Sequence, residues 1–160
     1  MSQDLNLFNK TNVIIWVSIL IGMVVLSIVV FVLDQGNTFT PIPQAQGVNQ
    51  LLFVLAVVFA FGILMLKRTA FLPQKIVTRV VHRSGEDKNN AILNLIRRNY
   101  IIVWVLAELI CIMGFINYIF AVNFQSYLVF AIVAIYSVLI NYPRQYLAEI
   151  CIERLTEYNE

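Results

Sequence analysis

Four long apolar segments constrain this chain more than any other feature. They cover residues 13–33, 48–66, 100–122 and 124–142. A helix needs about 20 residues to cross a bilayer, and lipid offers no hydrogen-bond partner to an open backbone structure. Of the 160 residues, 60% are hydrophobic and 12% are charged, whereas about 25% of a soluble domain is charged. The sequence therefore predicts an all-α fold, an integral membrane four-helix bundle that forms a single domain over residues 1–160.

The distribution of basic residues predicts how the chain is threaded. Residues 67–99 hold eight of the eleven Lys and Arg, whereas residues 34–47 and the short connection after residue 122 hold none. Because Lys and Arg accumulate in cytoplasmic loops, we expect the 67–99 loop, the N-terminus and the tail at 143–160 to be cytoplasmic. The first apolar segment is too long for a signal peptide and lacks a small-residue cleavage site, so we expect it to remain a helix of the mature protein.

A basic amphipathic helix is predicted from Pro73 onward. Pro73 is tolerated in the first turn of a helix, and the apolar residues after it fall on one side: Ile76, Val77, Val80 and Val81. Such a helix lies flat on the anionic inner leaflet, which attracts Lys and Arg. The alternative is that the charges serve only to set the topology. The basic residues expected at the membrane surface are Lys75, Arg79, Arg83, Arg97 and Arg98.

Two further cytoplasmic helices are expected. Ser84 and Asp87 form an approximate capping box, so the third long helix should begin near Gly85 and protrude from the membrane as a docking point for another subunit. Pro143 ends or kinks the fourth apolar segment, and the tail after it carries two stripes at helical spacing. The apolar stripe consists of Tyr146, Leu147, Ile150, Cys151 and Leu155, and the acidic stripe of Glu149, Glu153 and Glu157.

The sequence offers no set of residues for catalysis. His82 is the only histidine, which argues against a histidine-based metal site and against a Ser-His-Asp triad within one chain. Cys111 and Cys151 lack the spacing of metal ligands, and we expect both to be reduced packing residues. No nucleic-acid-binding module is present. We therefore expect no enzyme activity, no catalytic residue, no metal, no cofactor and no nucleic-acid partner.

Glu108 is the single carboxylate inside the run VWVLAELICIMGF. An ionised carboxylate within a bilayer costs about 2.5–3.5 kcal/mol on insertion scales, so we expect Glu108 to face other helices or a partner protein. Ala107, Cys111 and Gly114 give this side of the helix a groove of small residues where another helix can approach closely. Asn117 lies on a different side and should bond to a neighbouring helix. The hydroxyl groups expected near Glu108 are those of Ser18, Ser27 and Ser137.

The run LAELICIMGFINYIF, residues 106–120, resembles the ion-binding helix of rotary ATPase proteolipids. In that helix an Ala-Glu or Pro-Glu pair precedes an aliphatic-x-Gly pattern, and the resemblance implies that Glu108 carries an ion. The sequence departs from that family in its first two apolar segments. Each contains one glycine, Gly22 and Gly62, where a proteolipid has a glycine-rich inner helix.

The whole chain resembles a family of small bacterial four-span inner-membrane proteins. The resemblance rests on the aromatic first segment VIIWVSILIG, the basic middle loop, IIVWVLAELICIMGF in the third segment and YPR after the fourth. It implies four spans and a bacterial inner membrane, and it supplies no activity.

Two functions are consistent with these features. The favoured one is a non-catalytic accessory or scaffold subunit that packs against a larger membrane assembly, or against a second copy, through Ala107, Cys111 and Gly114. The alternative is a small proton- or cation-coupled transporter in which Glu108 is the coupling residue. The expected partners are the anionic inner leaflet together with other membrane subunits or another copy of the chain.

Overall fold

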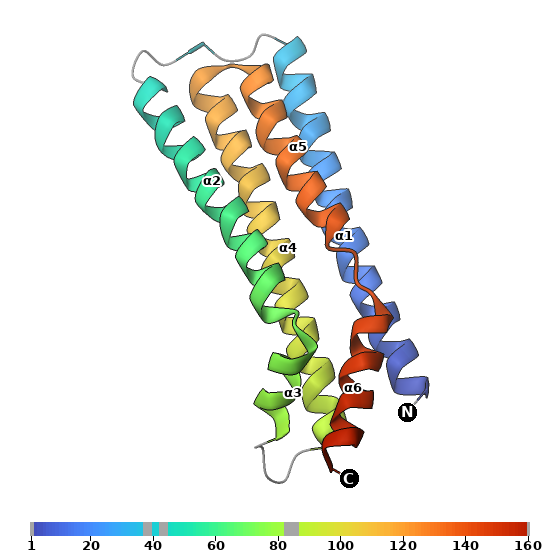
Figure 1. Ribbon diagram of the computed structural model, residues 1–160. Helices are drawn as coiled ribbons and strands as arrows, with labels where there is room; N and C mark the ends of the chain where they lie inside the picture. Colours follow the sequence, from blue (N-terminus) through green and yellow to red (C-terminus); the bar gives the residue numbers. More distant parts are fainter. Residues whose placement is uncertain (1, 37–39, 42–44, 82–86, 160) are drawn as a thin grey trace.

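The computed structural model describes residues 2–36, 40–41, 45–81 and 87–159, and every regular element in these ranges is an α-helix. The all-α prediction is confirmed. The four long helices run side by side (Figure 1) and are α1 (Ser2–Gln35), α2 (Ala45–Ala70), α4 (Lys88–Ala121) and α5 (Phe124–Ile140). Two short helices, α3 (Pro73–Val81) and α6 (Gln145–Asn159), lie at the end of the molecule that holds both termini.

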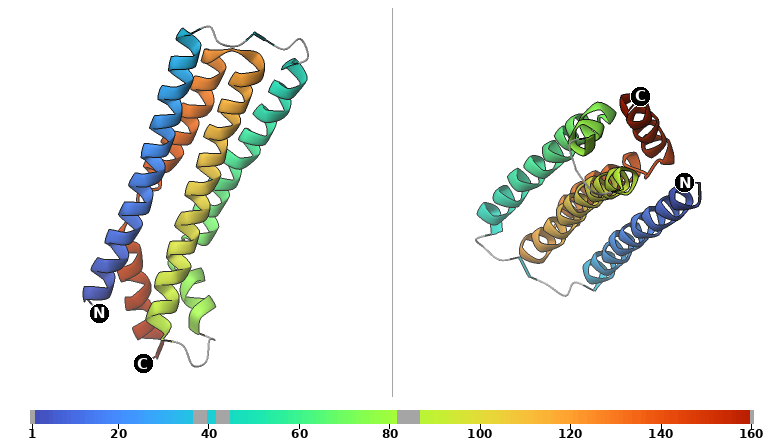
Figure 2. Two further views of the ribbon diagram at one scale, coloured as in Figure 1. Left: turned by 180° about the vertical axis from the view of Figure 1, so that it is seen from behind. Right: turned by 90° about the horizontal axis from the view of Figure 1, so that it is seen from below.

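α4 is the central helix of the fold. It packs against α5, α2 and α1, whereas the described parts of α1 and α2 do not contact each other. Figure 2 shows α4 between α1 and α2, with α5 behind it in the view from below. The arrangement is therefore more open than a closed four-helix bundle, and one face of α4 stays uncovered between α1 and α2. Apolar side chains on the outside of α1 and α2 are exposed along most of their length.

Three of the described helices are long and apolar enough to cross a membrane: Leu5–Gln35, Gly47–Ala70 and Lys88–Ala121. α5 has only 17 residues, fewer than the roughly 20 that a span needs. Together with α6, from which it is bent by 44°, it has the composition of a fourth span. The described chain thus contains three membrane-capable helices, or four if this bent pair counts as one.

Both α1 and α4 extend well beyond the predicted apolar segments. α1 begins at Ser2, and Leu5 and Phe8 in its first turns are buried as part of the main hydrophobic core. α4 begins at Lys88 with Asp87 as its N-cap, whose carboxylate accepts a hydrogen bond from the Asn89 N–H at 3.1 Å. The expected capping residue Ser84 and the expected start near Gly85 lie outside the described residues.

The two short helices have different outcomes. α3 starts at Pro73 as predicted, and Ile76, Val77 and Val80 are buried. α6 follows Pro143 as predicted, and its buried side overlaps the expected apolar stripe only in part, because the helix packs against both α3 and α4. Cys151 and Leu155 of that stripe are buried, Tyr146 is 68% exposed, and Ala148 and Ile152 are buried in addition.

Two tryptophans close the end of α5, where the last carbonyl groups of a helix have no partner within the helix. The Trp104 indole N–H donates to the Asn141 carbonyl at 3.0 Å, and the Trp16 indole N–H donates to the Val138 carbonyl at 2.9 Å. Trp104 is fully buried. These bonds allow the chain to leave α5 and turn into α6 inside the packed core.

Candidate functional site

Glu108 lies on α4 where this helix passes α1. Its side chain is half-buried, and Gly22 of α1 lies opposite: a Cβ on Gly22 would be 4.0 Å from Glu108 Oε1. Gly22 itself is exposed, so the carboxylate stands at the edge of the α1–α4 interface. Among the described residues, no N–H or O–H group donates a hydrogen bond to it. The site therefore presents an unsatisfied acceptor at an otherwise apolar surface.

The three serines expected near Glu108 use their protons elsewhere. Ser18 donates to the Ile14 carbonyl at 2.9 Å, Ser27 to the Met23 carbonyl at 2.8 Å and Ser137 to the Val133 carbonyl at 2.7 Å. Each bond runs one helical turn back, which is the usual choice of a serine within an apolar helix. A hydroxyl has a single proton to donate, so none of the three satisfies Glu108.

The small-residue face of α4 is occupied within the chain. Ala107 and Cys111 are fully buried, and a Cβ on Gly114 would lie 2.6 Å from Phe130 Cβ of α5. α5 therefore fills the groove that the sequence analysis offered to another subunit. The face therefore serves close helix packing within the chain, and it is not open to an external partner.

A short chain of polar groups crosses the core close to this face. Ser27 Oγ and Tyr127 Oη are 2.8 Å apart, and Cys111 Sγ lies 3.9 Å from Tyr127 Oη. Because Ser27 donates its own proton to Met23, the Tyr127 hydroxyl must donate to Ser27. Sequence reasoning did not single out Tyr127 for this role. The signal that could have identified Tyr127 is that a buried tyrosine hydroxyl needs a hydrogen-bond partner.

Two buried asparagines have no partner in the described part of the chain. Asn12 on α1 and Asn117 on α4 are each 0% exposed, and neither their side-chain oxygen nor their nitrogen is hydrogen-bonded. The bond expected from Asn117 to a neighbouring helix is therefore not found among the described residues. An unpaired amide costs roughly 1–3 kcal/mol, so both positions reduce the stability of the isolated chain.

The basic residues predicted for the membrane surface separate into different environments. Arg79 of α3 and Arg98 of α4 line one pocket of about 320 Å³, and Lys75 is exposed. Arg97 points to a different side of α4, where its guanidinium lies 5.4 Å from the centre of the Phe8 ring. Arg83 lies outside the described residues. The sequence thus named the residues, but only the fold shows which two share a site.

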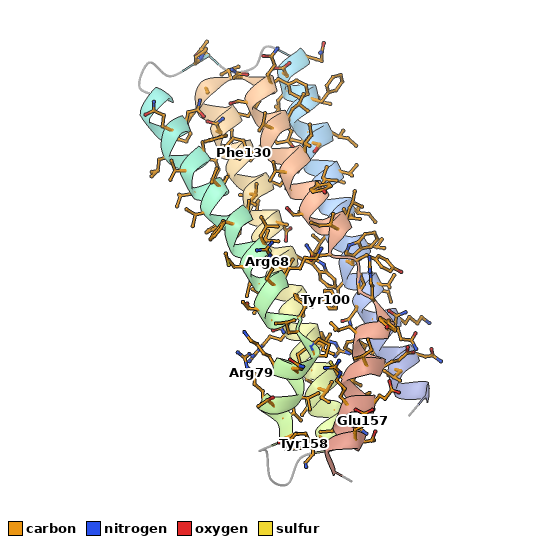
Figure 3. The ribbon with its side chains drawn as sticks, in the orientation of Figure 1. Arg68, Arg79, Tyr100, Phe130, Glu157 and Tyr158 are labelled. Atoms are coloured by element: carbon orange, nitrogen blue, oxygen red, sulfur yellow. The ribbon has the colours of Figure 1, made fainter. Side chains whose placement is uncertain are left out.

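A larger hollow of about 660 Å³ lies between α3 and α6. α6 contributes Glu153, Glu157 and Tyr158 to its wall, and Figure 3 shows the last two at the end of this helix. α3 contributes Val77 and Thr78. Two residues of the acidic stripe, Glu153 and Glu157, thus border this hollow, and all three glutamates of the stripe, Glu149 included, are exposed.

Cys151 of α6 is expected to resist alkylation in the folded protein. It is fully buried, and burial raises the pKa of its thiol to about 11, although Arg154 opposes the shift. Since the thiolate is the reactive form, labelling by iodoacetamide at pH 8 should be slow until the protein is unfolded. The mass shift of the peptide that contains Cys151, after labelling with and without denaturant, measures this separately from Cys111, which is also free. Equal labelling rates in the two states would show that Cys151 is accessible.

The described residues contain no group of three or more His, Cys, Asp or Glu side chains placed to hold a metal ion. The arrangement around Glu108 can instead accept a hydrogen bond or a positive charge from outside the chain. No family model, curated protein or solved structure matches this sequence.

Proposed function

We propose that the protein is a non-catalytic accessory or scaffold subunit of a larger membrane assembly. The observation that supports this function best is the position of Glu108, which is half-buried at the α1–α4 edge and has no donor in the described chain. A carboxylate left in this state inside a bilayer costs about 2.5–3.5 kcal/mol on insertion scales. A neighbouring protein helix that brings a donor removes this cost.

The proposal includes a bacterial inner-membrane location with four spans and both termini in the cytoplasm. Its support is the clustering of charge at one end of the molecule. Both termini lie there, together with α3 and the start of α4 (Figure 1), and residues 67–99 hold eight of the eleven Lys and Arg. The connections at the opposite end contain no Lys or Arg. This asymmetry is the pattern of a positively charged cytoplasmic side.

The chemistry of the partner follows from the depth of Glu108. It lies ten residues beyond Arg98 along α4, or about 15 Å at 1.5 Å per residue. The apolar segments of this chain contain no Lys or Arg, so a second copy cannot supply a cation at that depth. The partner is therefore a different membrane protein, with a helix that presents Lys or Arg against Glu108 and Gly22.

Replacing Glu108 by Gln tests this function. Gln keeps the size of the side chain but removes its charge, and loss of one member of a buried ion pair costs about 3–5 kcal/mol. We expect Glu108→Gln to lose most of its stoichiometric partner during purification in mild detergent, while the chain alone keeps its melting temperature. The control is Glu149→Gln on α6, which removes the same charge from an exposed position and should retain the partner.

The transporter alternative gives a different result in the same experiment. If the protein is a transporter, Glu108→Gln should keep the same associated proteins but lose cation flux in liposomes. That combination would overturn the accessory role. Loss of the partner from both variants would mean that charge in general, and not Glu108, controls assembly.

A further inference from the structure

Arg79 and Arg98 form a basic pocket on the side of the molecule away from α5. The lining consists of Arg79, Val80, Ala91, Asn94, Leu95 and Arg98, with a volume of about 320 Å³. Arg79, Asn94 and Arg98 are exposed, and within the described chain no carboxylate pairs with either arginine. Two guanidinium groups and an amide thus line one small space that has no carboxylate among its lining residues, and such a donor set suits the oxygens of a phosphate group.

The pocket continues into the uncovered face of α4. Arg98 is followed at helical spacing by exposed apolar residues that rise along the same side of the helix. These residues are Ile102, Val105, Leu109, Ile112 and Ile116. α1 and α2 flank this face without contacting each other, as the left view of Figure 2 shows. A basic pocket at the end of an exposed apolar helix face is complementary to a molecule with an anionic head and a hydrocarbon chain.

We infer that this site binds one anionic phospholipid of the inner leaflet, with its phosphate between Arg79 and Arg98 and an acyl chain along Ile102, Val105 and Leu109. The inference rests on the proposed membrane orientation, which places Arg98 at headgroup depth, but it does not depend on the accessory role. It goes beyond a general attraction of basic residues to the membrane surface, because it assigns two of them to one ligand and excludes Lys75 and Arg97. Arg97 is engaged instead with Phe8 on another side of α4.

The test uses the purified full chain in detergent, stripped of lipid and titrated with phosphatidylglycerol or phosphatidylcholine that carry identical acyl chains. Bound lipid is counted by native mass spectrometry. The unaltered protein should bind one phosphatidylglycerol in preference to phosphatidylcholine. Arg79→Gln and Arg98→Gln should each weaken this binding about fivefold, the loss expected for removing one basic residue near an anionic headgroup. Equal affinity of the unaltered protein for the two lipids would overturn the inference without reference to any variant.

The matched control is Lys75→Gln, which removes the same charge from an exposed position on α3 outside the pocket. It should leave the affinity for phosphatidylglycerol unchanged. An equal loss of affinity in all three variants would mean that basic residues attract the lipid in general and that no specific site exists. Inorganic phosphate and glycerol phosphate distinguish a lipid from a free phosphate, since both lack the acyl chain. If either displaces phosphatidylglycerol at comparable concentration, the ligand is a soluble phosphate and the lipid assignment fails. None of these outcomes changes the partner loss expected for Glu108→Gln, so the two proposals fail independently.

Discussion

Replacing Gly114 by alanine is expected to destabilise the folded protein by about 1–3 kcal/mol, the usual cost of adding a group to a filled core. The new Cβ would stand 2.6 Å from Phe130 Cβ and 3.1 Å from Phe130 Cγ. Phe130 is 3% exposed, so it cannot swing away, and α4 and α5 must separate instead. Because these two helices form the centre of the fold, the loss should appear as a lower melting temperature in detergent.

Gly62 of α2 provides the matched control for this substitution. No atom lies within 4 Å of a Cβ placed there, and alanine is the better helix former by about 0.5–1 kcal/mol. Gly62→Ala should therefore leave stability unchanged or raise it slightly. If Gly114→Ala and Gly62→Ala had the same effect, the close approach of α4 and α5 at Gly114 would be wrong.

Replacing Trp104 by alanine should have the largest effect on stability, about 3–5 kcal/mol. Trp104 is the largest of the fully buried side chains, and it also satisfies the Asn141 carbonyl at 3.0 Å. Trp104→Phe helps to separate the two contributions, because it keeps one aromatic ring in the core but removes the N–H donor together with the five-membered ring that carries it. We expect the Phe variant to lose about 1–3 kcal/mol, the cost of an unsatisfied buried carbonyl, as measured by denaturant or thermal unfolding in detergent.

Trp16→Phe is the control for the hydrogen bond. Trp16 donates to the Val138 carbonyl, but that carbonyl also accepts the Asn141 backbone N–H at 3.2 Å. Removing the Trp16 donor therefore leaves no orphan acceptor, and the cost should be clearly smaller than for Trp104→Phe. The reverse order would contradict the assigned role of Trp104 in closing the end of α5.

The helices of the fold could be predicted from the sequence because the surrounding medium determines which patterns of apolar and polar residues form them. Helices that cross lipid must be long and apolar. In α3, the alternation of Ile76, Val77 and Val80 with charged residues indicates which side of the helix is buried. The packing of the long helices could not be predicted in the same way. α1 and α2 are apolar on all sides, so their sequences contain no signal for which side meets α4. The uncovered face of α4 results from that packing, so it could not be predicted from the sequence either.

The site residues show the same limit. Glu108 was identifiable as a carboxylate in an apolar run, but its position opposite Gly22 depends on where α1 packs. Arg97 and Arg98 are adjacent in sequence and reach different environments, since each helical residue turns the side chain by about 100°. Arg79 joins Arg98 only because α3 folds back on α4. Tyr146 was expected in the apolar stripe of α6 but is exposed, because the positions of α3, α4 and α1 together determine which side of α6 is buried.

The most direct test of the accessory role is the mass of the protein extracted from its native membrane in mild detergent or polymer discs. Native mass spectrometry distinguishes the chain of 18.3 kDa from its complexes. We expect a defined complex that contains a different membrane protein in fixed stoichiometry and that dissociates in the Glu108→Gln variant. Recovery of the chain alone, or only with copies of itself and lipid, would contradict the proposal.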